Sequence, residues 1–334
     1  YLRLTLPKTY SAQHWRMAWI GFDFGLFVSL TVILITRKTI GTEQFENWGW
    51  RIPFWVSILM VIISFFIRKN MQESPVYAKL KAEGKSSHNP LKESFGNRYN
   101  FKFVLLALFG ATMGQGVVWY TGQFYAMNFI GKVCGVASEQ TDTIMATALL
   151  LGTPFFIFFG SLSDKIGRKK IMMLGLLLAI VSYRPLYNKI YHTIDVHEKT
   201  IVKQAIISSK SEVIRKNADS DSIKTTIKRF DYADGSSNTI TQKDTLTLSN
   251  QIKVNPEIKK SISLNNHDYW LLIILVFIQI IFVTMVYGPI AAFLVELFPT
   301  NIRYTSMSLP YHIGNGVFGG LLPAVATYLA SKAN

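Results

Sequence analysis

Long runs of apolar residues alternate with short polar segments along most of the chain. Seven runs come close to the roughly 20 apolar residues that a helix needs to cross about 30 Å of hydrocarbon. They are residues 15–36, 52–67, 103–130, 143–162, 171–187, 269–298 and 308–329. Because lipid does not tolerate unpaired backbone groups, the pattern predicts helices and not strands. The expected fold class is therefore all-α membrane, a polytopic helical bundle with seven spans present.

The charges between the spans predict an orientation. Residues 68–102 carry 8 basic and 3 acidic side chains, and residues 161–170 carry 4 basic and 1 acidic. Residues 37–51 and 131–142 are far less basic. Basic loops stay on the cytoplasmic side, so we expect a cell-membrane (inner-membrane) protein whose chain starts in the cytoplasm and whose residues 190–268 are external.

Residues 190–268 differ from the rest of the chain. They contain 12 basic and 10 acidic residues, much Ser, Thr and Asn, and no apolar run that could cross a membrane. Polarity favours a solvated external insert with little fixed structure. Two alternatives stay open: a short amphipathic helix over residues 199–216, and an exposed strand or hairpin over residues 239–248.

The composition and the scattered reactive residues exclude several classes of protein. The chain is 49% hydrophobic and only 16% charged, where soluble domains have about 25% charged residues. Its net charge of +15 lies mostly in the loops expected to be cytoplasmic, so nucleic acid is not an expected partner. His192, Asp195, His197 and Glu198 lack the spacing of a metal site, and the single Cys134 excludes an internal disulfide. We therefore expect neither metal nor cofactor, and no enzyme.

The segment Gly-Ser-Leu-Ser-Asp-Lys-Ile-Gly-Arg-Lys-Lys at residues 160–170 carries family information. It resembles the loop motif of the major facilitator superfamily, a glycine, an acid and then Gly-Arg followed by basic residues. Its glycines permit close approach and a sharp turn, and its acid can pair with a basic group. The resemblance implies a cytoplasmic gate motif, which comprises Gly160, Asp164, Gly167, Arg168, Lys169, Glu296 and Arg303.

Further segments strengthen this resemblance. Glu-Ser-Pro at residues 73–75 and Glu-Leu-Phe-Pro-Thr-Asn-Ile-Arg at residues 296–303 are similar to signatures that close helices of that superfamily. Residues 49–54, 114–125 and 304–316 look like its metabolite:proton symporter branch. The resemblance implies part of a twelve-helix (6+6) major facilitator fold.

The seven spans then match helices five to eleven of such a fold, and the chain is expected to be a fragment or a truncated copy. The implied domains follow from that match. They are residues 1–67 (two helices of the N-terminal half), 68–102 (cytoplasmic inter-half loop), 103–189 (three helices of the C-terminal half), 190–268 (external polar insert) and 269–334 (two further C-terminal-half helices).

The third span carries a polar stripe. Gln115, Trp119 and Gln123 recur every four residues on one helical face, with Tyr120 beside them. Amide groups facing lipid are costly, so this face should point into the bundle. Two interpretations remain, a substrate cavity or hydrogen bonds between helices. Close helix packing is the plainer explanation of the nearby pair formed by Gly110 and Gly114.

Other spans contribute further candidates. Asp23 lies within the first span, where an ionised acid is costly, so proton coupling and a buried ion pair are both open. In the sixth span Tyr287 adjoins a Gly-Pro pair that predicts a kink. In the seventh span His312 and Asn315 are candidates for the pathway, although an interhelical histidine is the plainer interpretation of His312.

The leading hypothesis is a secondary active transporter, a proton-coupled symporter of a small polar metabolite, either an organic acid or a zwitterion. It would work by alternating access, as a monomer in the lipid bilayer, with the metabolite and the proton as its partners. The alternatives are a truncated, non-transporting homologue and a seven-helix receptor-like protein. The expected cytoplasmic N-terminus argues against the receptor.

Overall fold

The computed structural model describes residues 28–70, 75–84, 87–197, 199–216, 219–246 and 257–333. Five helices of this part are long and apolar enough to cross a membrane, and most of the described chain is helical, so the predicted helical membrane class is confirmed. Those five are Phe45–Ile67, Arg98–Val133, Ser138–Ile166, Arg168–Ile194 and Asn266–Leu297. Of the first predicted span only the end is described, where residues 28–40 are helical.

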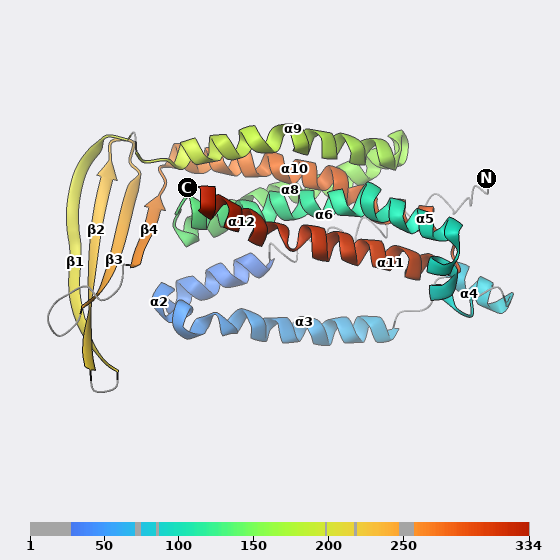
Figure 1. Ribbon diagram of the computed structural model, residues 1–334, viewed down its shortest axis with the longest axis horizontal. Coiled ribbons are helices and arrows are strands. Elements are labelled where there is room, and N and C mark those ends of the chain that lie inside the picture. The colour runs from blue at the N-terminus through green and yellow to red at the C-terminus, as the bar shows by residue number, and fades with distance from the viewer. Residues whose placement is uncertain are drawn as a thin grey trace. The chain divides into compact units, whose positions relative to one another are not determined.

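The chain divides into two compact units, which are described separately. Unit 1 comprises residues 1–126, 145–183 and 276–334, and unit 2 comprises residues 127–144 and 184–275. Figure 1 labels their elements. Labels with η are π-helical turns, which occur often at functional sites.

The first half of the chain contains α2 (Thr42–Gln44), η1 (Phe45–Gly49), α3 (Arg51–Asn70), α4 (Pro75–Ala82), η2 (Lys92–Gly96), α5 (Arg98–Ala107), η3 (Leu108–Thr112), α6 (Met113–Tyr120), η4 (Thr121–Tyr125), α7 (Ala126–Asn128) and η5 (Phe129–Val133). The longer helices that follow are α8 (Ser138–Ile166), α9 (Arg168–Ile194) and α10 (Asn266–Leu297). The predicted seventh span is divided into α11 (Arg303–Ile313), η6 (Gly314–Gly319) and α12 (Leu322–Ala333).

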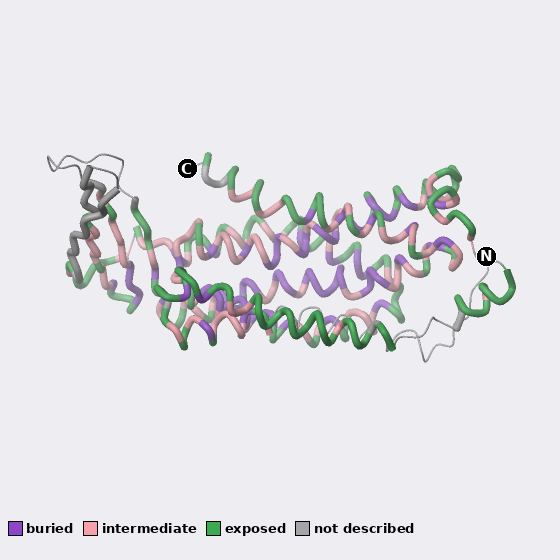
Figure 2. The backbone as a smooth tube through the Cα atoms, turned by 90° about the horizontal axis from the view of Figure 1, so that it is seen from below, coloured by how far each residue is buried: buried purple, intermediate pink, exposed green. Residues whose placement is uncertain are grey.

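The core of unit 1 forms where α5, η3, α9 and α10 meet. Its buried members are Val104, Ala107, Ala111, Met172, Ile290, Leu294 and Phe298. The apolar segment of α10 is two-thirds buried, whereas that of α3 is 0% buried, and Figure 2 shows α3 exposed along nearly its whole length. A helix that is apolar all round and exposed requires lipid or other helices around it.

Unit 2 contains a four-stranded antiparallel sheet, formed by β1 (Ile201–Lys216), β2 (Asp219–Tyr232), β3 (Ser237–Leu246) and β4 (Glu257–Ser263) in chain order. Figure 1 shows the four strands side by side. The expectation of a largely unstructured insert is therefore wrong. The alternative of an amphipathic helix over residues 199–216 is wrong as well, because β1 occupies that segment, whereas the predicted strand over residues 239–248 is largely confirmed by β3.

The sheet forms because its strands are rich in Ile, Val and Thr, whose branched side chains fit a pleated surface. Asp234-Gly235 supplies the turn between β2 and β3, and Gly235 has a φ of +83°. Such an Asp-Gly pair between alternating strands is a strong hairpin signal. The sequence thus contains a local strand signal within a segment whose overall polarity is typical of a loop.

Backbone hydrogen bonds join β4 to the segment before α8. The Ile262 N–H donates to the carbonyl oxygen of Gly135 (2.8 Å), and the Ala137 N–H donates to that of Ile262 (2.9 Å). The Gln140 amide then exchanges two hydrogen bonds with the backbone of Leu264. The sheet is thus continuous with the helical part of unit 2.

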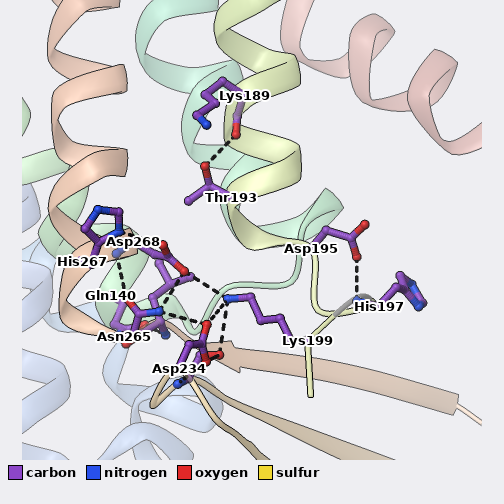
Figure 3. A network of polar contacts seen from close by, with 12 residues as sticks. Gln140, Lys189, Thr193, Asp195, His197, Lys199, Asp234, Asn265, His267 and Asp268 are labelled. Carbon is purple, nitrogen blue, oxygen red and sulfur yellow. Dashed lines mark hydrogen bonds and ion pairs between the residues drawn. The ribbon is translucent and has the colours of Figure 1, made fainter. Parts of the chain in front are cut away.

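A polar network fixes the start of β1, the β2–β3 turn and the start of α10 together (Figure 3). The Lys199 ammonium lies between the carboxylates of Asp234 (2.6 Å) and Asp268 (3.0 Å). Asn265 donates from Nδ2 to both carboxylates and caps α10 by accepting the Asp268 N–H at 2.8 Å. Ser236 donates to Asp234 from its N–H and its hydroxyl.

The network shifts the pKa values of Asp234 and Lys199. Desolvation is the largest influence on each and opposes ionisation, but hydrogen bonds from Lys199 and Ser236 outweigh it at Asp234, whose pKa falls well below its usual range. The two carboxylates likewise outweigh desolvation at Lys199, whose pKa is raised. Stability from Asp234 is therefore fully present above its unfolded pKa and is lost as the pH falls through the lowered, folded value.

We predict that Asp234→Asn lowers the free energy of opening of the β2–β3 hairpin by about 1 kcal/mol at neutral pH, because one ion pair and its hydrogen bonds are lost at a partly exposed site. Hydrogen exchange of the hairpin amides in the whole chain measures this energy. In the unsubstituted protein it should be constant at mildly acidic to neutral pH and decline below about pH 4.

Asp231→Asn is the matched control, because Asp231 pairs with Arg229 of the same strand, β2, and this ion pair joins no two segments of the chain. Its effect should stay below about 0.5 kcal/mol. Equal effects of the two substitutions would contradict an anchoring role of the network.

Candidate functional site

A cluster of amide and aromatic side chains lies between α6, α10, α11 and η6 in unit 1. Gln115 and Asn315 exchange two hydrogen bonds, at 3.0 Å from Gln115 Nε2 to Asn315 Oδ1 and at 3.2 Å in the reverse direction. Asn315 Nδ2 also donates to the carbonyl oxygen of Tyr311 (2.9 Å). Gln115 therefore bonds a neighbouring helix, which is one of the two functions that its position in the polar stripe predicted.

The aromatic part of the cluster is continuous with these amides. Trp119 stacks on Tyr287, with ring centroids 5.8 Å apart and planes inclined by 26°, and contacts Tyr120 edge to face at 4.9 Å. The hydroxyls of Tyr287 and Tyr311 are 2.7 Å apart. Tyr311 was not among the predicted site residues, although its position four residues before Asn315 was a usable signal.

The expected inward orientation of the stripe is confirmed by burial. Gln115, Trp119 and Gln123 are only 1%, 7% and 2% exposed. His312 differs, because it is exposed, and its Nδ1–H donates to the carbonyl oxygen of Ser308 one turn earlier on its own helix (2.7 Å). Among the described residues, His312 thus bonds its own helix and not a neighbouring one.

Glycines permit the close helix contact that forms this cluster. A Cβ at Gly116 would lie 2.5 Å from the carbonyl oxygen of Gly314, and one at Gly319 would lie 2.5 Å from the Tyr120 ring. Gly110, by contrast, has no described atom within 4 Å of a Cβ built there. Among the described residues Gly110 thus has no packing partner, whereas a Cβ at Gly114 would lie 3.1 Å from the Leu176 side chain.

A second polar site joins the α8–α9 turn to the end of α10. Arg168 donates to both carboxylate oxygens of Glu296, at 2.7 and 2.9 Å, and its other terminal nitrogen lies 3.0 Å from Asp164. Bidentate pairs of this kind fix orientation as well as charge. Gly167, which precedes the arginine, has a φ of +109°, a conformation that favours glycine.

The other residues of the predicted gate motif also lie in unit 1, each with contacts of its own. Gly160 approaches α10 closely, because a Cβ at Gly288 would lie 3.5 Å from the Gly160 nitrogen. Lys169 lines an apolar cavity of about 240 Å³ together with residues of α5 and α10. Arg303 donates to the carbonyl oxygen of Phe298 (3.0 Å), and desolvation lowers the pKa of its guanidinium.

Two further predictions concern charge and metal. Asp23 lies outside the described residues. In the part of the chain that the structure describes, no group of three or more His, Cys, Asp or Glu side chains is arranged to hold a metal ion.

The sequence of the chain is similar to those of known transport proteins. The family model described as Major Facilitator Superfamily matches residues 16–187, just over half of the chain. A putative proline/betaine transporter of Staphylococcus haemolyticus is 29% identical over 178 residues, which are 51% of this chain and 36% of that protein. No solved structure matches the chain.

Two proteins of Escherichia coli extend the comparison. Its alpha-ketoglutarate permease is 27% identical over 157 residues, 47% of this chain and 35% of the permease. Its inner membrane metabolite transport protein YhjE is 22% identical over 325 residues, 94% of this chain and 55% of that protein. The chain thus spans about a third to just over half of the length of these relatives.

The apolar helices and the two polar sites define a polytopic membrane protein with polar groups buried between its helices. The chain belongs to the major facilitator superfamily, as residues 160–170 and their related segments predicted.

We predict that Gly116→Ala destabilises the protein by about 1–3 kcal/mol, because the added methyl group meets backbone that has no room to move. The apparent melting temperature of the purified chain in detergent should fall. Gly110→Ala is the control on the same helical segment and should leave it unchanged or slightly raised, because alanine favours helix and meets no neighbour. Equal melting temperatures of the two variants would contradict the close contact.

Proposed function

We propose that the protein carrying this chain is a secondary active transporter that moves a small polar metabolite across the membrane by alternating access. The observation that carries the proposal is the buried cluster of amides and aromatic rings in a chain of this superfamily. Polar side chains are costly inside a membrane and mark pathways when they occur there. The metabolite transporters among the relatives support the same function.

We propose a zwitterion as the substrate class. Trp119, Tyr287 and Tyr311 offer aromatic faces, which attract ammonium groups, especially those that are poorly hydrated. The Gln123 amide can donate a hydrogen bond to a carboxylate, and the described residues of the cluster include no Lys or Arg that would fix a dicarboxylate. A relative described as a proline/betaine transporter supports this class, whereas one described as an alpha-ketoglutarate permease supports an organic acid.

Coupling and topology belong to the same proposal. We propose proton-coupled symport with Asp23 as the coupling acid, a cytoplasmic start of the chain, and an external insert over residues 190–268. The basic loops at residues 68–102 and 161–170 support this orientation.

We propose that the contact of Arg168 with Asp164 and Glu296 is a cytoplasmic gate. It joins the turn between α8 and α9 to the end of α10. Glu296 lies nine residues beyond Tyr287 on α10, about 13 Å along the helix axis. At that distance it contributes to opening and closing and not to substrate contact.

One pair of variants tests both sites. Gln123→Ala should raise the dissociation constant of glycine betaine about 2- to 10-fold, because one polar contact is lost. Glu296→Gln should leave that constant within about twofold, because an exposed gate carboxylate contributes little to a distant site, and should still lower uptake. Binding is measured on purified protein, and uptake in cells that lack their own carriers.

The substrates to compare are glycine betaine, proline and alpha-ketoglutarate. Preference for alpha-ketoglutarate would contradict the zwitterion class. Binding or uptake of none of them, at normal expression, would favour a non-transporting homologue. Equal loss of binding in both variants would contradict the gate.

A further inference from the structure

A cavity of about 580 Å³ lies in unit 2 beside the last turns of α9. It is lined by Phe129, Arg184, Pro185, Tyr187, Asn188 and Tyr191. Within the described part of the chain, Arg184 has no ion pair or side-chain hydrogen bond, and none of the lining residues is acidic. An exposed guanidinium thus lies among aromatic rings without a carboxylate to neutralise it.

The position of Arg184 along α9 places it close to a membrane surface. The helix begins at the basic end Arg168, and Arg184 follows sixteen residues later, about 24 Å along an axis that crosses about 30 Å of hydrocarbon. Between residues 171 and 183 the exposed residues of α9 are apolar, with Leu177, Ile180 and Val181 58%, 77% and 67% exposed. Along α9 the exposed side chains therefore change from apolar to polar at Arg184, at the depth where lipid headgroups are expected.

The aromatic residues fit the same boundary. Tyr187 contacts Phe129 edge to face, with ring centroids 5.1 Å apart and planes inclined by 86°, so one wall of the cavity is fixed. Tyr191 follows one turn later and is exposed. Tyrosines concentrate at membrane interfaces, where the ring meets acyl chains and the hydroxyl meets headgroups.

We infer that this cavity binds the headgroup of an anionic phospholipid, with the Arg184 guanidinium on the phosphate and the tyrosine hydroxyls and Asn188 amide around it. Arginine matches phosphate with two parallel hydrogen bonds. The lipid lies in the leaflet on the side of the membrane that holds residues 195–265, which follow α9 directly. A zwitterionic headgroup is attracted less, because its own ammonium offsets the phosphate charge that the Arg184 guanidinium binds, and none of the lining residues is acidic.

Native mass spectrometry of the whole purified chain with phosphatidylglycerol and phosphatidylcholine tests this site. The unsubstituted protein should retain phosphatidylglycerol in preference to phosphatidylcholine. Arg184→Gln should reduce bound phosphatidylglycerol about fivefold or more, since charge-assisted hydrogen bonds to the phosphate are lost. Asn188→Ala should reduce it by about twofold, the effect of one neutral hydrogen bond.

Lys189→Gln is the matched control. It removes the same charge from the same end of α9, but Lys189 lines a different cavity. Phosphatidylglycerol retention should stay within about twofold of the unsubstituted protein, as for a surface charge. Equal loss of bound phosphatidylglycerol in Arg184→Gln and Lys189→Gln would show that only the overall positive charge matters, and would overturn the site. Equal retention of both lipids by the unsubstituted protein would also overturn the site. So would displacement of phosphatidylglycerol by millimolar inorganic phosphate, because it would identify a soluble anion as the ligand.

Discussion

The backbones of α6 and η6 approach each other at Gly116 and Gly314, and the polar cluster of unit 1 depends on that contact. Only residues without a Cβ permit the approach. Because the helices are so close, the short side chains of Gln115 and Asn315 reach each other and satisfy both amides. Inside hydrocarbon no water replaces such hydrogen bonds. The two amides therefore keep their hydrogen-bond partners only while the helices stay this close.

Two basic side chains fix the two ends of α10. Lys199 lies between Asp234 and Asp268 at the start of the helix, and Arg168 binds Glu296 near its end. Both contacts connect segments that are distant in sequence. The apolar middle of α10, between them, contains no charged residue. Ionic contacts at the ends of an apolar helix avoid the cost of burying charge in the bilayer.

The helical part of the fold was predictable because hydrocarbon imposes a length and a polarity on every span. The inward orientation of Gln115, Trp119 and Gln123 was predictable for the same reason. The sheet was not predictable from average polarity, which an exposed sheet shares with a solvated loop; only the Asp234-Gly235 turn and the branched residues around it indicate strands. Partners from distant segments, such as Tyr311 for Tyr287, depend on helix packing, which spacing within one helix does not reveal.

Cysteine accessibility tests the central claim, that the buried stripe borders an aqueous pathway, most directly. With Cys134 replaced by serine, a cysteine at position 123 is compared with one at position 106, where Leu106 is 52% exposed and borders an apolar cavity. The account predicts that a small hydrophilic thiol reagent modifies position 123, that substrate slows the modification, and that position 106 stays unreactive. Lack of reaction at position 123 from both sides of the membrane, with or without substrate, would contradict it and would leave the stripe as a bond between helices.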